Sequence, residues 1–137
     1  KSPQGNLRDR FADESVRTVA QGAALIEAHA CGGFNIKLQK FGGLTSSIVA
    51  ARLARQAGLS PMAGCMLESP VGVAAMGALV CAVGDFAMVD LDPLELIARN
   101  PVQGGAMIRS GRMVLSSEPG LGITAIEGMQ RLWEYPS

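Results

Sequence analysis

Short apolar segments recur along the chain, and a polar segment with ionisable side chains follows each of them. The apolar segments end near residues 12, 36, 63 and 89, so the intervals between their ends are 24, 27 and 26 residues. An interval of about 25 residues accommodates one strand, one helix and their loops. Four such units in succession predict an α/β fold with a parallel sheet.

Capping residues indicate where these elements begin. Ser15 and Thr45 are expected to cap the first two helices through their hydroxyl oxygens. Ser69 followed by Pro70 is typical of an N-cap with proline at the first helical position. We therefore expect strands at residues 10–13, 34–38, 61–65 and 86–90, and helices at residues 17–30, 46–57, 70–83 and 93 to about 99.

The last part of the chain follows another pattern. Apolar residues alternate between 106 and 115 around Ser110-Gly111, which predicts a β-hairpin. A short helix is expected near Trp133 in the tail. We therefore divide the chain into residues 1–103, with the four strand–helix units, and residues 104–137, with the hairpin and the tail.

Polar side chains at the carboxyl ends of repeated strand–helix units are the layout of a (βα)8-barrel active site. Such a barrel has eight units and typically about 250 residues. This chain has 137 residues and four units. The sequence therefore predicts half of a (βα)8 barrel.

Composition narrows the classes of partner and compartment. Lys+Arg and Asp+Glu both number 12 and aromatic residues make up 4%, which indicates no binding surface for nucleic acid or anionic membrane. No run of 18 apolar residues is present, and the first residues lack the apolar core of a signal peptide. Cys31, Cys65 and Cys81 show no CxxC spacing, which favours buried free thiols over a disulfide framework or a zinc site. We expect a cytoplasmic protein.

Two residues at the first strand ends have both structural and catalytic interpretations. Asp13 is either a surface carboxylate that helps to cap the next helix or a ligand of Mg²⁺, whose site needs further partners. Lys37 is either a lysine whose stem covers the barrel rim or a general base. A lysine beside a divalent cation, with little water around it, has its pKa lowered toward neutrality. Lys40 is expected to be structural or solvated.

Further carboxylates follow the third and fourth strands. Asp90 and Asp92 lie two residues apart, so on a strand they would face the same way and converge on one point. They are either turn residues before Pro93 or a clamp for a cation, that is, a metal ion or a substrate ammonium group. Glu68 either lines the pocket or favours the N-terminus of the following helix through the helix dipole.

In order along the chain, these motifs resemble the C-terminal half of the enolase superfamily. Within it they are similar to the muconate-lactonising subgroup, and there to the dipeptide epimerases of the L-Ala-D/L-Glu type. The match runs through essentially the whole chain. The motifs are Ala12-Asp-Glu-Ser15, Asn35-Ile-Lys-Leu-Gln-Lys40 with Gly42-Gly43, Gly64-Cys-Met-Leu-Glu-Ser69, Asp90-Leu-Asp92 and Pro119-Gly-Leu-Gly122.

The resemblance implies strands five to eight of a (βα)8 or (βα)7β barrel and assigns two residues to the chemistry. Asp13 matches the third Mg²⁺-binding carboxylate, at the end of the fifth strand. Lys37 matches one of two acid/base lysines, at the end of the sixth strand. The implied reaction is abstraction of the proton α to a carboxylate, with Mg²⁺ as the Lewis acid.

The same resemblance assigns five residues to the substrate. Cys65, Met66 and Glu68 match a segment of the seventh strand that borders the substrate. Asp90 and Asp92 match the pair after the eighth strand that holds the α-ammonium group of a dipeptide.

Several parts of the family pattern have no counterpart in this sequence. These are the second-strand lysine motif, the carboxylates of the third and fourth strands, and the N-terminal capping domain. We therefore expect a truncated isomerase, inactive alone, that forms a homo-oligomer or a complex with the missing N-terminal half. Residues 104–137 would pack on the capping domain.

Three functions remain as alternatives at this point. The first is a dipeptide epimerase. The second is another enzyme of the subgroup, such as a muconate or chloromuconate cycloisomerase or an o-succinylbenzoate synthase-like enzyme. The third is a non-catalytic half-barrel that serves as an assembly module. The Asp90-x-Asp92 pair favours the epimerase, because a dianionic substrate without an ammonium group gains nothing from two carboxylates.

Overall fold

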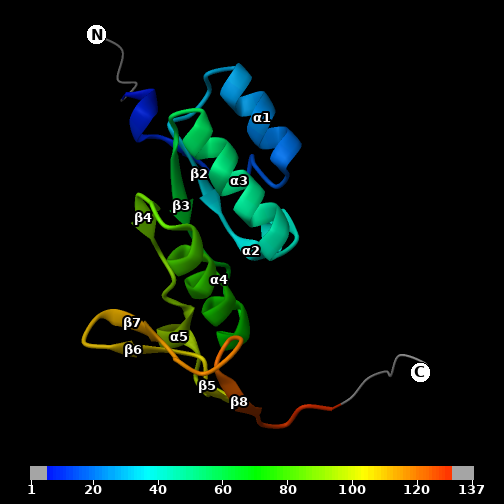
Figure 1. Ribbon diagram of the computed structural model, residues 1–137, viewed down its shortest axis with the longest axis vertical. Helices are drawn as coiled ribbons and strands as arrows, with labels where there is room; N and C mark the ends of the chain where they lie inside the picture. The colour runs from blue at the N-terminus through cyan, green and yellow to red at the C-terminus, as the bar shows by residue number, and fades with distance from the viewer. Residues whose placement is uncertain (1–5, 131–137) are drawn as a thin grey trace, which may run out of the picture.

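The computed structural model describes residues 6–130 and contains a sheet of four parallel strands in the order β1-β2-β3-β4 (Figure 1). Each strand pairs with the next one along the chain, so every connection crosses over by way of a helix. This arrangement confirms the predicted half barrel. The strands are β1 (Phe11–Ala12), β2 (Gly33–Ile36), β3 (Ser60–Ala63) and β4 (Met88–Val89).

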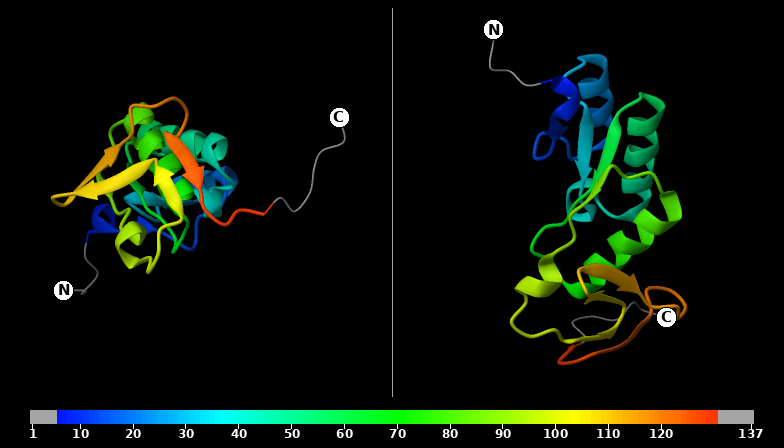
Figure 2. Two further views of the ribbon diagram at one scale, coloured as in Figure 1. Left: turned by 90° about the horizontal axis from the view of Figure 1, so that it is seen from below. Right: turned by 90° about the vertical axis from the view of Figure 1, so that its left-hand side faces the viewer.

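Helices follow each strand, and α1 and α3 lie side by side on the same side of the sheet (Figures 1 and 2). The one-turn helix α2, between β2 and α3, was not predicted, because four residues are too few to show helical periodicity. The helices are α1 (Val19–Glu27), α2 (Leu38–Phe41), α3 (Leu44–Gln56), α4 (Pro70–Val83) and α5 (Pro93–Leu96), preceded by a 3₁₀ turn, η1 (Leu7–Asp9).

Two of the three predicted N-caps are wrong. Helix α1 is capped by Thr18, whose hydroxyl accepts a hydrogen bond from the Gln21 backbone N–H at 3.1 Å, and not by Ser15. Helix α3 is preceded by Gly43, and Thr45 lies inside the helix. The third prediction is confirmed, because the Ser69 hydroxyl accepts from the Gly72 N–H at 3.4 Å and Pro70 is at the start of α4.

Strand β2 separates an apolar layer from a polar one. Phe34 and Ile36 are fully buried in the core between the sheet and the helices. A Cβ atom on Gly22 of α1 would lie 3.0 Å from the Phe34 ring, so glycine allows α1 to approach the strand closely. Because side chains alternate along a strand, Asn35 and Lys37 project from the opposite face.

The C-terminal part contains two antiparallel pairs. Strands β6 (Ala106–Arg109) and β7 (Arg112–Leu115) form the predicted hairpin, and Ser110 and Gly111 have φ values of 50° and 72° as its tight turn requires. The second pair, β5 (Val102–Gly104) with β8 (Ile123–Ile126), was not predicted. Strand β5 also runs across the expected boundary between residues 103 and 104.

The hairpin packs on α4. A Cβ atom on Gly77 would lie 2.9 Å from the Leu115 side chain and 3.2 Å from the Met113 sulfur, so these side chains lie directly over the helix. This contact accounts for part of the nearly all-apolar surface of α4. The helix expected near Trp133 lies outside the described residues. Within residues 6–130, no helix is long and apolar enough to cross a membrane.

The caps of α3 and α4 lead to a matched prediction. Ser69→Ala removes the oxygen that accepts from the Gly72 N–H, and we expect it to lower the free energy of unfolding by about 1 kcal/mol. Thr45→Ala should leave stability unchanged or raise it slightly, because Thr45 lies inside a helix, where alanine is favoured. Urea unfolding followed by circular dichroism measures both. Equal losses for the two variants would contradict the assignment of the caps.

Candidate active site

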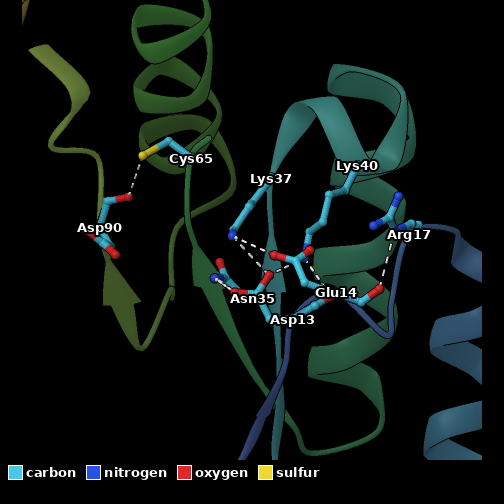
Figure 3. Close-up of polar contacts among 8 residues, drawn as sticks. All are labelled: Asp13, Glu14, Arg17, Asn35, Lys37, Lys40, Cys65 and Asp90. Carbon is cyan, nitrogen blue, oxygen red and sulfur yellow. Dashed lines mark hydrogen bonds and ion pairs between the residues drawn. The ribbon is translucent and has the colours of Figure 1, made fainter. Parts of the chain in front are cut away.

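The Asp13 carboxylate lies at the centre of a cluster of polar side chains at the carboxyl ends of β1 and β2 (Figure 3). Ala12 pairs with Phe34 in the parallel register, so the next residues, Asp13 and Asn35, lie opposite each other. The Asn35 Nδ2 donates a hydrogen bond to Asp13 Oδ2 at 2.8 Å. The register of the sheet thus brings these two side chains together.

Two ammonium groups bind the other carboxylate oxygen. The Lys40 Nζ lies 2.5 Å from Asp13 Oδ1 and 2.7 Å from the Asp13 main-chain oxygen. The Lys37 Nζ lies 3.1 Å from Asp13 Oδ1 and 3.4 Å from Glu14 Oε1. The side chain of Lys40 is 3% exposed and that of Lys37 is 12% exposed. Lys40 is therefore a structural partner of Asp13 and is not solvated.

These contacts shift the pKa values of Asp13 and Lys37 in this cluster. Burial by itself raises the pKa of Asp13, but the hydrogen bonds from Lys40, Lys37 and Asn35 outweigh it and lower the pKa to about 2. Burial also lowers the pKa of Lys37, but the hydrogen bond and charge of Asp13, with those of Glu14, outweigh it and raise the pKa. This differs from the lowered pKa expected for Lys37 beside a divalent cation, because here its nearest charges are carboxylates.

A second cluster of polar side chains, Cys65, Asp90 and Asp92, lies at the ends of β3 and β4. The Cys65 Sγ is 3.2 Å from the Asp90 main-chain oxygen and 3.9 Å from Asp92 Oδ1. Burial, with the charges of Asp92 and Asp90, raises the pKa of the Cys65 thiol to about 11. Asp90 follows β4 directly, but Asp92 lies at the start of α5, so the expected alternation on one strand does not describe the pair.

A pocket opens between this second cluster and the hairpin. Both carboxylates of the predicted clamp, Asp90 and Asp92, line it and are exposed to solvent. Glu95 adds a third carboxylate, which sequence reasoning missed, and Ile108 and Met113 of the hairpin form an apolar wall. The pocket is thus acidic on one side and apolar on the other.

The remaining predicted residues lie on the loop between β3 and α4. The Gln39 Nε2 donates a hydrogen bond to Glu68 Oε2, which links α2 to this loop. Burial raises the pKa of Glu68, partly offset by that hydrogen bond. Met66 is 41% exposed, and its backbone makes a hydrogen bond with the Glu68 carboxyl. Glu68 is thus held by Gln39 of α2 and by the backbone of its own loop.

Asn35 and Gln39 lie inside a recognised motif but were given no role from the sequence. The spacing could have found Asn35, because it lies two residues before Lys37 and so shares its face of the strand. Gln39 could not be found, because its direction depends on the unpredicted turn of α2.

A divalent cation would need oxygen ligands at these strand ends. Asp13 is ionised at neutral pH, and its Oδ2 accepts one hydrogen bond among the described residues, from Asn35 Nδ2. Oxygen atoms of this kind are the ligands that Mg²⁺ prefers. Among residues 6–130, however, no three His, Cys, Asp or Glu side chains are placed to hold a metal ion. Asp13 thus offers one carboxylate of the kind that Mg²⁺ prefers, and the described residues do not complete a site around it.

A lysine and a carboxylate thus lie at neighbouring strand ends of a parallel half barrel, at the end where (βα)8 barrels have their active sites. Residues 10–128 match the family described as enolase C-terminal domain-like, and the chain belongs to that family. This confirms the resemblance found in the sequence motifs.

Curated relatives in this family are epimerases. The chain is 43% identical to an L-Ala-D/L-Glu epimerase of Clostridium acetobutylicum, over 85% of this chain and 32% of the relative. It is 40% identical to an L-Lys-D/L-Arg epimerase of Methylococcus capsulatus, over 88% of this chain and 34% of the relative. The chain thus spans about a third of the length of the curated relatives it matches.

Solved structures also match this chain over about a third of their own length. A dipeptide epimerase of Methylococcus capsulatus, in complex with Mg and the dipeptide L-Arg-D-Lys, matches with a TM-score of 0.79 and 37% identity, over 87% of this chain and 36% of that one. A muconate lactonizing enzyme matches with a TM-score of 0.80 and 26% identity, over 85% of this chain and 32% of that one.

The three thiols differ in their surroundings, and their reactivity should follow. Cys81 is exposed, contrary to the expectation of buried thiols, whereas Cys31 is buried. With a pKa of about 11, Cys65 is a thiolate on the order of one part in a thousand at pH 8. We expect iodoacetamide to modify Cys81 at least about tenfold faster than Cys65, as followed by peptide mass mapping. Faster labelling of Cys65 would show that its thiol is not surrounded by carboxylates as described.

Proposed function

We propose that this chain supplies part of the active site of a Mg²⁺-dependent isomerase that abstracts the proton α to a carboxylate, with a dipeptide as substrate. The observation that carries the proposal is the distance of 3.1 Å between Lys37 Nζ and Asp13 Oδ1 at adjacent strand ends. An acid/base group thereby lies beside a candidate Mg²⁺ ligand, at the end of a barrel where active sites form.

Asp13 and Lys37 have different roles in the proposed reaction. When bound, Mg²⁺ supplies Lewis-acid stabilisation of the negative charge that develops on the substrate carboxylate. Asp13 would be one of its ligands. Lys37 exchanges a proton with the substrate α-carbon through Nζ, which lies 3.1 Å from the Asp13 carboxylate. Inversion of the carbon requires a second base on the opposite face, which another part of the protein would contribute.

The acidic pocket supports a substrate with an ammonium group. Asp90 and Asp92 are exposed at its mouth and would bind the α-ammonium group of a dipeptide, and Cys65, Met66 and Glu68 would border the substrate. The likeness to a muconate lactonizing enzyme supports a cycloisomerase as the second candidate. A dianionic substrate would be repelled by these carboxylates, so the epimerase is favoured.

The sheet supports an assembly with further strands. Met62 is the register partner of Asn35 and Met88 is the register partner of Met62, so all three share a face of the sheet, and Met88 is 46% exposed. The edge strands β1 and β4 have two residues each, shorter than the long edges that would drive self-association. We propose that this sheet pairs with further barrel strands to close a barrel, and that residues 104–137 pack on a capping domain.

The unpaired state of the cysteines agrees with a reducing compartment such as the cytoplasm. Cys31, Cys65 and Cys81 are all free thiols. Disulfides are rare in that compartment and common outside it.

An exchange experiment tests the proposed reaction. The chain is assayed alone and combined with the part of the Clostridium acetobutylicum epimerase that it does not match. L-Ala-L-Glu in D₂O with MgCl₂ should gain deuterium at the glutamate α-carbon, as detected by NMR. Lys37→Ala should lower the exchange rate by about 10²–10⁴-fold, because an acid/base group is lost.

Arg52→Ala is the matched control for the loss of a positive charge, since Arg52 lies on the surface of α3. It should leave the exchange rate unchanged. Exchange by the Lys37→Ala variant at the unmutated rate would remove Lys37 from the mechanism. No exchange by the unmutated chain in either form would favour the non-catalytic half barrel.

The carboxylate pair has its own test in the same assembly. Asp90→Asn and Asp92→Asn should each weaken dipeptide binding by about 1.5–3 kcal/mol, because each removes a hydrogen bond between charged groups. Calorimetric titration measures the binding, and the N-acetylated dipeptide, which lacks the ammonium group, is the control ligand. Equal affinity of the unmutated assembly for the acetylated and free dipeptides would contradict this role.

A further inference from the structure

Asn35 has an unusual environment for a polar side chain. This side chain is polar but only 6% exposed, and its Oδ1 is buried without a hydrogen-bond partner. Its Nδ2 makes one bond, to Asp13 Oδ2. A buried acceptor without a donor is costly, so a polar side chain in such a place calls for a compensating role.

The orientation of the Asn35 amide follows from its partner. The ionised Asp13 carboxylate only accepts hydrogen bonds, so the amide must direct Nδ2 toward it. Oδ1 then has to face β3. Asn35 provides the one hydrogen bond to Asp13 Oδ2 among the described residues, whereas Lys37 and Lys40 both bind Oδ1.

Gly64, just after β3, makes room for this arrangement. A Cβ atom on Gly64 would lie 2.2 Å from the Asn35 Oδ1 and 3.0 Å from its Nδ2. Gly64 is absent from the glycines with positive φ, so its backbone conformation is open to other residues. The position therefore needs glycine for space rather than for conformation.

From these contacts we infer that Asn35, seated against Gly64, is a positioning residue that fixes the plane of the Asp13 carboxylate for a divalent cation. The inference rests on the proposed function. With Oδ1 held by two ammonium groups and Oδ2 by an amide, the carboxylate cannot rotate. Each oxygen has two lone pairs, so Oδ2 can accept from Asn35 and still bind a cation.

The experiment measures Mn²⁺ binding by electron paramagnetic resonance on the combined assembly described above, without substrate. Asn35→Ala and Gly64→Ala should each weaken binding by about 10–100-fold, the usual effect of removing a group that orients a metal ligand. The double variant should be no weaker than Asn35→Ala within about threefold, because the shortened side chain no longer meets the new Cβ. Independent effects would multiply instead.

A kinetic readout separates positioning from general damage to the fold. The Mg²⁺ concentration for half-maximal exchange should rise about 10–100-fold in Asn35→Ala, while the rate at saturating Mg²⁺ stays within about threefold. Met62→Leu, at the register partner of Asn35, is the control and should change neither value. If Gly64→Ala fails to fold, recovery of the fold in the double variant supports the steric contact.

The outcomes are distinguishable. Unchanged Mn²⁺ affinity in a folded Asn35→Ala assembly overturns the inference and leaves the proposed function standing. Multiplicative losses in the double variant overturn the coupling between Gly64 and Asn35, and the inference with it. No Mn²⁺ binding by the unmutated assembly overturns both the proposed function and the inference.

Discussion

One carboxylate, that of Asp13, organises the polar end of this half barrel. It is held by Lys40 at 2.5 Å, Lys37 at 3.1 Å and Asn35 at 2.8 Å. The Lys40 ammonium is almost completely buried, and a buried charge is tolerated only when an opposite charge and hydrogen bonds compensate it. Asp13 must therefore be ionised for the ends of β1 and β2 and the turn of α2 to keep these positions.

That contact in turn depends on the parallel register of the sheet. Because neighbouring parallel strands run in the same direction, their carboxyl ends lie at one edge, and side chains in register share a face. Phe34 and Ile36 enter the core between sheet and helices, which leaves Asn35 and Lys37 for the opposite face. The same alternation that builds the core thus collects the polar side chains beside Asp13.

The site divides into a half in which lysines pair with carboxylates and a half that is acidic. Lys37 and Lys40 belong to the half at β1 and β2, whereas Asp90 and Asp92 line the pocket at the end of β4. The hydrogen bond between Gln39 and Glu68 joins α2 to the loop between β3 and α4. The acidic half would be the side for the ammonium group of the proposed substrate.

The sequence by itself determined the strand–helix repeat, the polar strand ends, the Ser69-Pro70 helix start and the hairpin at Ser110-Gly111, because each depends on local periodicity or on residues with strong conformational preferences. It could not choose between Ser15 and Thr18 as the first cap, since either hydroxyl can accept from a nearby N–H. Only the tertiary structure decided that Lys40 and Asn35 contact Asp13, that Gly64 leaves room for Asn35, and that β5 pairs with β8. These features join residues about 20 or more positions apart, and such contacts are set by packing and register rather than by local preference.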